Sequence, residues 1–312
     1  MENIILKTED IVKQYANHRA LDKVSISVPQ NSIYGLLGPN GAGKTSLIRI
    51  INQITAPDEG KIWFKGESLK SKHIGMIGYL PEERGLYKKM KVGEQAIYLS
   101  QLKGVPKAVA MKRLKYWFER FEIENWWNKK VEELSKGMQQ KVQFIVTIIH
   151  EPEFLIFDEP FSGFDPINTE ILKQEILRLK ENGATIIFST HNMSSVEELC
   201  DNIALIDNSK KILEGKVSDI KDQYKENRYS ICIQDFNQDI HKLMEGIAKV
   251  EHCELSGNKT NLRVKLFENS SSNEFLHKIL PHGHISFFNE ILPSMNDIFI
   301  SNVQDKDSIK VQ

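Results

Sequence analysis

One stretch near the start of the chain, from Gly38 to Thr45, constrains the fold more than any other. It reads GPNGAGKT and fits the pattern G-x-x-x-x-G-K-[ST] at every fixed position. An apolar run at 33–37 precedes it and an apolar segment at 46–51 follows it, which predicts a buried strand, a loop and a helix in that order. Glycines let the backbone N–H groups of such a loop face one anion, and the helix start adds positive potential. We therefore expect a site for nucleotide phosphates.

Two side chains of this loop are expected to contact the nucleotide phosphates and the metal ion. Lys44 is expected to reach the β- and γ-phosphates, and Thr45 is expected to ligate Mg²⁺. The alternative is a glycine-rich turn with a surface lysine, which the complete pattern and its strand and helix context disfavour. The other residues that we expect to bind the nucleotide here are Gly38, Pro39, Asn40, Gly41, Ala42, Gly43 and Ser46.

Length and composition bound the class of protein. A chain of 312 residues is expected to form two domains, one of them large. A formal net charge of -1 without a long basic segment does not indicate nucleic acid as a partner. Three cysteines without C-x-x-C spacing favour free thiols in a reducing cytosol. The sequence shows neither a signal peptide nor an apolar run of bilayer length, so the chain itself is not expected to cross a membrane.

The pattern of apolar runs predicts an α/β fold of the P-loop NTPase type. Short apolar runs and turn residues in 1–35 predict an antiparallel N-terminal edge, with Tyr15 in its first connection. Continuous apolar runs at 153–158 and 184–189 flank a predicted helix, which indicates parallel strands in a mixed central sheet. Helical periodicity predicts an insertion at about 91–150, and its dense aromatic residues are better explained by packing than by a binding groove.

The rest of the chain predicts a second domain. The first domain is expected to span 1–217, and the polar run at 218–227 is interpreted as a linker. Strands alternating with helices, one of them at 240–250, predict a small α+β accessory domain at 228–304. Residues 305–312 are expected to form a tail. No catalytic motif falls in this second domain.

Acidic and basic side chains follow the two apolar strands directly. Asp158 and Glu159 end the first of them, and the carboxyl ends of parallel strands are where such folds bind ligands. We expect Asp158 to hold Mg²⁺ and Glu159 to act as the general base toward an attacking water, the alternative being a simple acidic turn. His191 follows the second strand and is expected to contact the γ-phosphate while orienting the water and Glu159.

Four further motifs produce a resemblance to a known family. The sequence LSKGMQQK at 134–141, which precedes a helix, resembles the signature sequence of the ATP-binding subunits of ABC transporters. Ser162–Asp165 resembles that family's short dimer-contact loop, and His191 its switch histidine. Tyr15 resembles the family's adenine-stacking aromatic residue, although it could also be an ordinary strand-end tyrosine. The resemblance covers residues 1 to about 215.

This resemblance implies a fold, ligands and an assembly. It implies ATP as the nucleotide, with Mg²⁺, and a head-to-tail pair of subunits, either a homodimer or a heterodimer. Each ATP is then expected to lie between the phosphate loop of one subunit and Ser135 and Gly137 of the other. Asp165 is expected to contribute to nucleotide binding at the same interface.

The chain departs from the family pattern at three positions. Lys136 and Met138 stand where the signature often has glycine and glutamine. Glu82 stands where most members have a glutamine that contacts Mg²⁺ and the water. A carboxylate can still ligate the ion, so we expect Glu82 in the metal site, but its charge near the triphosphate is unfavourable without the metal.

Two segments resemble one branch of the family. Residues 79–87 and 293–300 are similar to members that work in bacterial sodium, drug or peptide export. The resemblance implies a separate membrane permease as partner, and a cytoplasmic protein held at the inner face of the cell membrane by that permease. We expect the segment from Glu83 to Trp127 to form the dock for the permease.

Two other functions stay open from the sequence. A soluble ABC-type ATPase switch would use the same nucleotide domain, although such proteins usually carry two of these domains or a long coiled-coil insertion. A regulatory module that binds ATP with little turnover is compatible with Glu82 and Met138. The transported substrate cannot be read from this chain, because its selection would belong to the permease.

Overall fold

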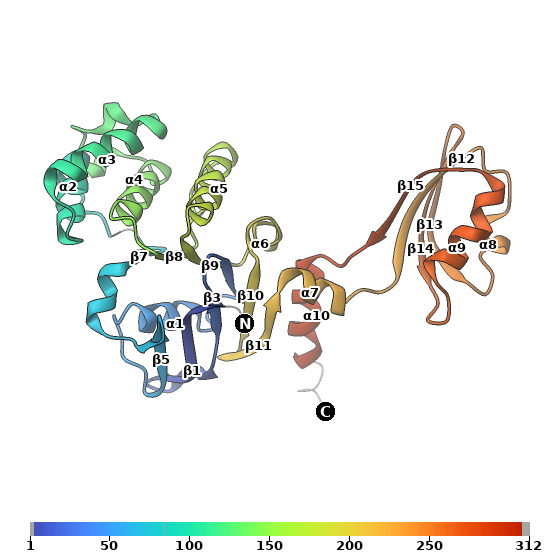
Figure 1. Cartoon of the computed structure of the whole chain (residues 1–312), viewed down its shortest axis with the longest axis horizontal. Helices are drawn as coiled ribbons and strands as arrows, with labels where there is room; N and C mark the ends of the chain where they lie inside the picture. The colour runs from blue at the N-terminus through green and yellow to red at the C-terminus, as the bar shows by residue number, and fades with distance from the viewer. Residues whose placement is uncertain (1–2, 84, 308–312) are drawn as a thin grey trace. The chain divides into compact units, whose positions relative to one another are not determined.

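The computed structural model of the chain describes residues 3–83 and 85–307. Arg84, which belongs to the segment expected to meet a permease, and residues 308–312 of the expected tail lie outside the described residues. The chain divides into two compact units, Met1–Val217 and Ser218–Gln312, and each is described by itself. Figure 1 labels the helices and strands of both units.

A six-stranded sheet forms the centre of the first unit. Its strands are β4 (Ile33–Leu37), β7 (Ile77–Leu80), β8 (Phe154–Asp158), β9 (Thr185–Thr190), β10 (Asn202–Asp207) and β11 (Lys210–Lys216). They lie in the order β11, β10, β4, β9, β8, β7, and all neighbours run parallel except β10 and β11, which form a hairpin. β4, β8 and β9 are buried at every residue, as expected for strands covered on both faces. The mixed central sheet that the sequence predicts is confirmed.

The N-terminal strands form an antiparallel sheet of their own and are not an edge of the central sheet. They are β1 (Ile4–Tyr15), β2 (His18–Val24), β3 (Ser27–Pro29), β5 (Glu59–Phe64) and β6 (Glu67–Ser68). β1 pairs with β2, β3 and β5 in turn, because bulges interrupt its register and Asp10 adopts a φ of 48°. The strand continues through these bulges to Tyr15. The sequence-based placement of Tyr15 in a connection was wrong, since it is the last residue of β1.

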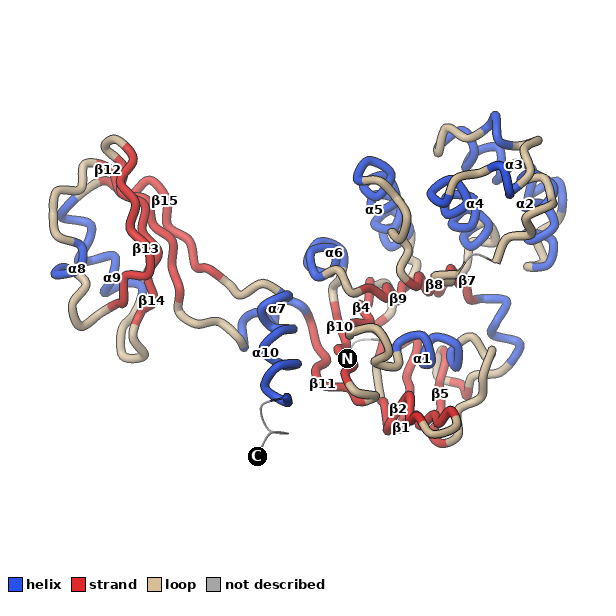
Figure 2. Tube along the Cα trace, turned by 180° about the vertical axis from the view of Figure 1, so that it is seen from behind, coloured by secondary structure: helices blue, strands red, loops and turns tan. Residues whose placement is uncertain are grey.

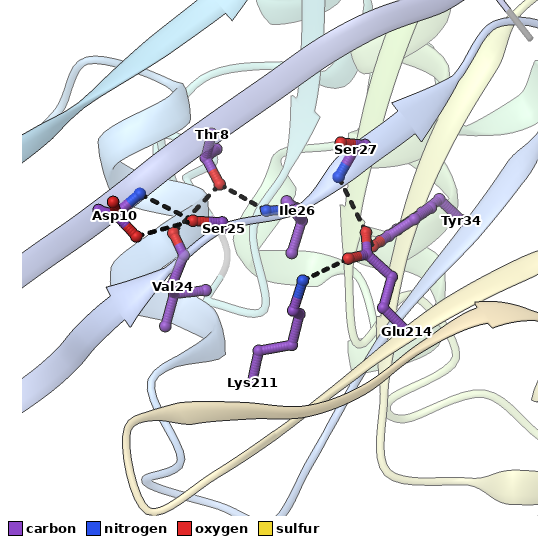
Figure 3. A network of polar contacts seen from close by, with 9 residues as sticks. All are labelled: Thr8, Asp10, Val24, Ser25, Ile26, Ser27, Tyr34, Lys211 and Glu214. Atoms are coloured by element: carbon purple, nitrogen blue, oxygen red, sulfur yellow. Dashed lines mark hydrogen bonds and ion pairs between the residues drawn. The ribbon is translucent and has the colours of Figure 1, made fainter. Parts of the chain in front are cut away.

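The carboxylate of Glu214 in β11 joins the two sheets of the first unit (Figure 3). Its Oε1 accepts hydrogen bonds from the Tyr34 hydroxyl in β4 at 2.6 Å and from the Ser27 backbone N–H in β3 at 2.9 Å. Lys211 donates to its Oε2 at 2.5 Å. Burial and the charge of Glu214 raise the pKa of Tyr34, so this phenol stays protonated and remains a donor. The N-terminal sheet is thereby tied to the strand that leads into the phosphate loop.

Helices pack around the central sheet and form the expected insertion. The α-helices of the first unit are α1 (Lys44–Ile51), α2 (Val92–Leu102), α3 (Lys107–Arg120), α4 (Lys136–Ile148), α5 (Pro166–Glu181) and α6 (Met193–Leu199), with 3-10 helices at Ser71–Met76, Glu124–Trp126 and Val131–Glu133. The helical insertion contains α2, α3 and α4 (Figure 1). Its Trp127 ring packs on Gly93, where an added Cβ would lie 2.3 Å from a ring carbon, and its centroid is 5.3 Å from that of Phe118. These aromatic residues therefore serve packing, as the sequence favours.

The second unit contains an antiparallel sheet with helices packed on one face (Figure 2). Its elements are α7 (Val217–Gln223), β12 (Arg228–Gln234), α8 (Ile240–Leu243), β13 (Ala248–Ser256), β14 (Lys259–Leu266), α9 (Ser272–Ile279), a 3-10 helix at Leu280–His282, β15 (His284–Ile291) and α10 (Met295–Asp307). The strand order is β13, β14, β12, β15. Buried side chains of β12 and β14, such as Ile231 and Val264, form a core with Met244 after α8 and Phe275 of α9.

Three boundaries in this unit differ from the sequence-based expectations. The helix expected at 240–250 was wrong, because α8 ends at Leu243 and the chain then forms β13. β13 is an edge strand that pairs only with β14, and most of its residues are exposed and polar, so the sequence carries no alternating apolar pattern there. The expected linker contains α7, in which Ile220 is buried. Helix α10 continues into the expected tail as far as Asp307.

None of the helices within residues 3–83 and 85–307 is both long enough and apolar enough to cross a membrane.

Candidate nucleotide site

The phosphate loop connects β4 to α1, and its conformation requires glycine at two crowded positions. Gly38 and Gly43 adopt φ angles of 148° and 114°. A Cβ added at Gly38 would lie 2.1 Å from the carbonyl oxygen of Ile206, and one added at Gly43 would lie 2.3 Å from that of Ala20. Gly41 also has a positive φ, 83°, but it faces open space. Backbone from β10 and β2 thus packs directly against the loop and holds its shape.

Lys44 is buried at the start of α1, and its charge is held at the loop. Its Nζ donates to the carbonyl oxygens of Gly38 at 2.7 Å and Pro39 at 3.0 Å. Burial lowers the pKa of Lys44, while the negative charges of three nearby carboxylates, led by Glu159, act against that change. The ammonium group therefore has weak backbone acceptors that a phosphate can replace.

Asp158 ends β8 beside the phosphate loop and fits a magnesium ligand. The Thr45 hydroxyl donates to its Oδ2 at 3.4 Å, so the two side chains expected at the metal face each other. Burial raises the pKa of Asp158, and the like charges of Glu82 and Glu159 raise it further. Among the described residues, no three His, Cys, Asp or Glu side chains converge into a metal cage. Mg²⁺ binds through one or two carboxylates together with phosphates and water.

Glu159 and His191 meet where β8 and β9 end. Nδ1 of His191 lies 2.7 Å from Oε1 of Glu159, and the Thr190 hydroxyl donates to the other carboxylate oxygen at 3.4 Å. The Glu159 backbone is left-handed, with a φ of 48°, and its N–H donates to the carbonyl oxygen of Ser189. A left-handed non-glycine residue is energetically costly and is often found at functional sites. The turn directs Glu159 away from the strand and toward His191.

The side chains of Lys44, Asp158 and Glu159 line a cavity of about 430 Å³, and His191 does not belong to its lining. Its volume suits a small polar ligand. Tyr15 lies at the rim with 39% of its surface exposed. The structure also places His18 and Ala20 of β2 in the wall, which sequence reasoning missed, because no motif marks them. The lining residues are Tyr15, His18, Ala20, Asn40, Gly41, Gly43, Lys44, Thr45, Ser46, Glu82, Asp158 and Glu159.

Six of the expected nucleotide-binding residues do not line this cavity: Gly38, Pro39 and Ala42 of the phosphate loop, and Ser135, Gly137 and Asp165. Ser135 is the N-cap of α4, and its hydroxyl accepts a hydrogen bond from the Met138 N–H at 3.3 Å. Gly137 packs against the loop after Glu159, where an added Cβ would lie 3.2 Å from the carbonyl oxygen of Gly163. Asp165 is the N-cap of α5 and accepts from the Asn168 N–H at 2.9 Å, which lowers its pKa.

The fold and this site define a class of protein. A glycine-rich loop between a buried parallel strand and a helix, with a lysine, a hydroxyl and carboxylates converging on it, is the site of a P-loop NTPase.

Comparison with known proteins agrees with this class and narrows it. The ABC transporter family matches residues 21–162, and the C-terminal domain family of DrrA1-3-like ATP-binding proteins matches residues 215–303. The ABC transporter ATP-binding protein YhaQ of Bacillus subtilis is 41% identical over 301 residues, which are 96% of this chain and 98% of that relative. The chain therefore belongs to the family of ABC transporter ATP-binding proteins.

Two further similarities are more distant. The Nod factor export ATP-binding protein I of Ralstonia nicotianae is 33% identical over 215 residues, covering 68% of this chain and 67% of that protein. A solved structure of an ATP-binding subunit of an ABC transporter has a TM-score of 0.66 and 29% identity, covering 70% of this chain and 93% of the other.

The crowding at Gly43 generates a prediction that a matched variant can test. Gly43→Ala forces a Cβ against the Ala20 carbonyl, whereas Gly41→Ala adds only backbone strain in open space. We expect Gly43→Ala to destabilise the protein by at least about 2 kcal/mol more than Gly41→Ala. Urea unfolding of both variants measures the difference. Equal losses would contradict the view that β2 backbone shapes the loop.

Proposed function

We propose that this chain is the ATP-hydrolysing subunit of an ABC export transporter and that it energises a separate membrane permease. The observation that carries this proposal is the cavity at the phosphate loop, where Lys44, Asp158 and Glu159 converge. Its place in the cell would be the inner face of the membrane, where the permease would hold it.

The residues around the cavity suggest how hydrolysis would proceed. Lys44 would exchange its two carbonyl acceptors for phosphate oxygens. Mg²⁺, when bound by Thr45 and Asp158 with Glu82 nearby, would neutralise part of the phosphate charge. Glu159 would accept the proton of the attacking water. His191, which already contacts Glu159, would hold that carboxylate in its orientation and contact the γ-phosphate.

A second subunit would complete each site. Ser135 is the N-cap of α4 and Gly137 lies in its first turn, both outside the cavity of their own chain, and a helix N-terminus attracts anions. In a head-to-tail pair, the start of α4 would approach the γ-phosphate held by the other chain, with Asp165 near the interface. ATP would then join the halves, and hydrolysis would release them.

A groove in the first unit offers a dock for the permease. It has a volume of about 710 Å³ and runs from α2 to the end of α4, with apolar walls that include Leu86, Leu99 and Val146. Large apolar side chains are exposed along this side, among them Tyr98 and Leu102. Exposed apolar groups in a cluster mark a protein interface. The groove overlaps the segment at 83–127 that the sequence proposes as the dock.

The direction of transport is proposed from similarity. The relative named for Nod factor export supports an export system. We propose a substrate of the sodium, drug or peptide kind, selected by the permease.

One prediction separates nucleotide binding from chemistry. Glu159→Gln removes the base but no phosphate contact, so it should bind ATP normally and lose hydrolysis by about 10²–10⁴-fold. Lys44→Ala removes a phosphate counter-charge and should weaken binding itself. Fluorescent-ATP titration and phosphate release measure the two effects. If Glu159→Gln retains substantial turnover, another group is the base.

The next prediction concerns the shared site. ATP should drive self-association of the Glu159→Gln protein, because a ligand that binds only the closed pair shifts association by mass action. Adding Ser135→Arg should prevent this association without weakening ATP binding to the single chain. Light scattering across ATP and ADP titrations provides the measurement, with ADP expected to have no effect. Association that survives Ser135→Arg would argue against a site shared through α4.

The dock can be tested with a pair of surface changes. Leu102→Asp places a charge on the proposed permease surface, and Leu255→Asp places one on the exposed edge strand β13, outside the segment at 83–127. We expect that only the Leu102→Asp variant no longer co-purifies with the permease from native membranes. Both variants should keep their basal ATPase activity. Mass spectrometry of the bound membrane protein is the readout. Equal retention by both variants would place the dock elsewhere.

A further inference from the structure

The groove proposed as the dock for the permease has a simple charge pattern. Among the described residues that line it, Lys103, the C-cap of α2, is the only charged side chain, and none is an aspartate or glutamate. The lining also contains His150. Burial lowers the pKa of His150 to about 4, and the charge of Lys103 acts in the same direction, so the ring is neutral at pH 7. The wall of the groove is therefore positive at one point and apolar or neutral elsewhere.

The ammonium group of Lys103 is bonded to backbone oxygens and not to a carboxylate of the described chain. Its Nζ donates to the carbonyl oxygen of Ile77 at 3.1 Å and to that of Ile74 at 3.4 Å. An ammonium group has three donors, so one N–H is left for another acceptor. Partial burial lowers the pKa of Lys103, and a carboxylate beside it would favour the charged form again. The residue as a whole is exposed, so a partner can reach it.

The apolar surface around Lys103 indicates what kind of molecule would bring this carboxylate. Ile54 and Leu102 line the groove and are 60% and 64% exposed, and Leu99 and Val146 belong to the same wall. Exposed apolar side chains in a cluster mark a protein interface. A protein segment that covers them must present apolar side chains, and charge complementarity favours a carboxylate opposite Lys103.

We propose that the permease segment held in this groove carries an aspartate or glutamate that forms an ion pair with Lys103. This inference rests on the proposed function, because it names the chemistry of the partner at the proposed dock. The apolar side chains of the segment cover Ile54, Leu102 and the rest of the wall. A segment with a lysine or arginine at the same point would leave two like charges in a groove without water, so Lys103 selects among permeases.

A carbodiimide cross-link tests the ion pair directly. The reagent activates a carboxylate, and a lysine amine in contact with that carboxylate then forms an amide bond. The full chain is purified with its permease from native membranes, treated with the reagent and analysed by mass spectrometry. We expect a cross-linked peptide that joins Lys103 to an aspartate or glutamate of the permease. Lys103→Arg keeps the charge but has no reactive amine, so it should still bind the permease and lose the cross-link.

Charge reversal provides a second measurement. Lys103→Glu places one carboxylate against another and should reduce the amount of co-purified permease by at least about tenfold. Lys259→Glu makes the same change at an exposed residue of β14, outside the segment at 83–127, and should have no effect. The cross-link is made in the unaltered chain, so it remains decisive if Lys103→Glu disturbs the backbone that Lys103 bonds.

The outcomes separate this inference from the proposed function. If a permease co-purifies but Lys103 forms no cross-link to it, or if Lys103→Glu retains it as well as Lys259→Glu does, the ion pair is refuted while the dock can stand. A cross-link from Lys103 to a carboxylate of this chain or of a second copy would give the groove another occupant and also overturn the inference. If no membrane protein co-purifies with the unaltered chain, the proposed function fails, and this inference fails with it.

Discussion

The balance of charge around the phosphate loop is the constraint on which the first unit depends. One buried lysine, Lys44, faces a group of carboxylates that includes Asp158 and Glu159, and burial shifts the pKa of both Lys44 and Asp158 against their charged forms. Such burial is unfavourable for both charged groups, and in the proposed function bound phosphates would pair with Lys44 while Mg²⁺ would pair with Asp158. The strand order places β4, β9, β8 and β7 side by side, so that the residues after these strands meet at one edge.

The same edge is linked to the helix that carries the signature sequence. The loop after Glu159 packs on the first turns of α4, where the Gln140 side chain donates to the carbonyl oxygen of Pro160 at 3.4 Å and Gly137 lies against Gly163. A displacement of the Glu159 turn is therefore felt directly at the start of α4. If α4 serves the ATP of a second subunit, as proposed, this contact gives a physical route between two sites of a pair.

Hydrogen bonds and backbone contacts from neighbouring strands stabilise this arrangement. Glu214 bonds strands of both sheets, and main-chain atoms of β2 and β10 press against Gly43 and Gly38. A hydrogen bond from Arg120 of α3 to Glu175 of α5 connects the helical insertion to the layer that contains the central sheet. The insertion thus contacts the catalytic layer both at the nucleotide edge and through the hydrogen bond between Arg120 and Glu175.

The sequence alone determined the phosphate loop, the parallel strands and the helical insertion. These follow from short-range patterns, because a complete loop motif and continuous apolar runs need no distant contact to be recognised. The sequence did not predict the edge strand β13, because most of its residues are exposed and polar. It also did not predict that the N-terminal strands form a sheet of their own, because the pairing of β1 with three partners depends on bulges.

Only the tertiary structure decided which residues share the cavity. His18 of β2 has no motif, yet the hairpin that ends β1 brings it beside Tyr15. The hydrogen bond between Arg120 and the buried Glu175 could not be found from sequence either, because the two residues are 55 positions apart in the chain. Sequence determines which chemical groups are available, whereas distances, burial and unpaired atoms arise only when segments far apart in the chain pack together.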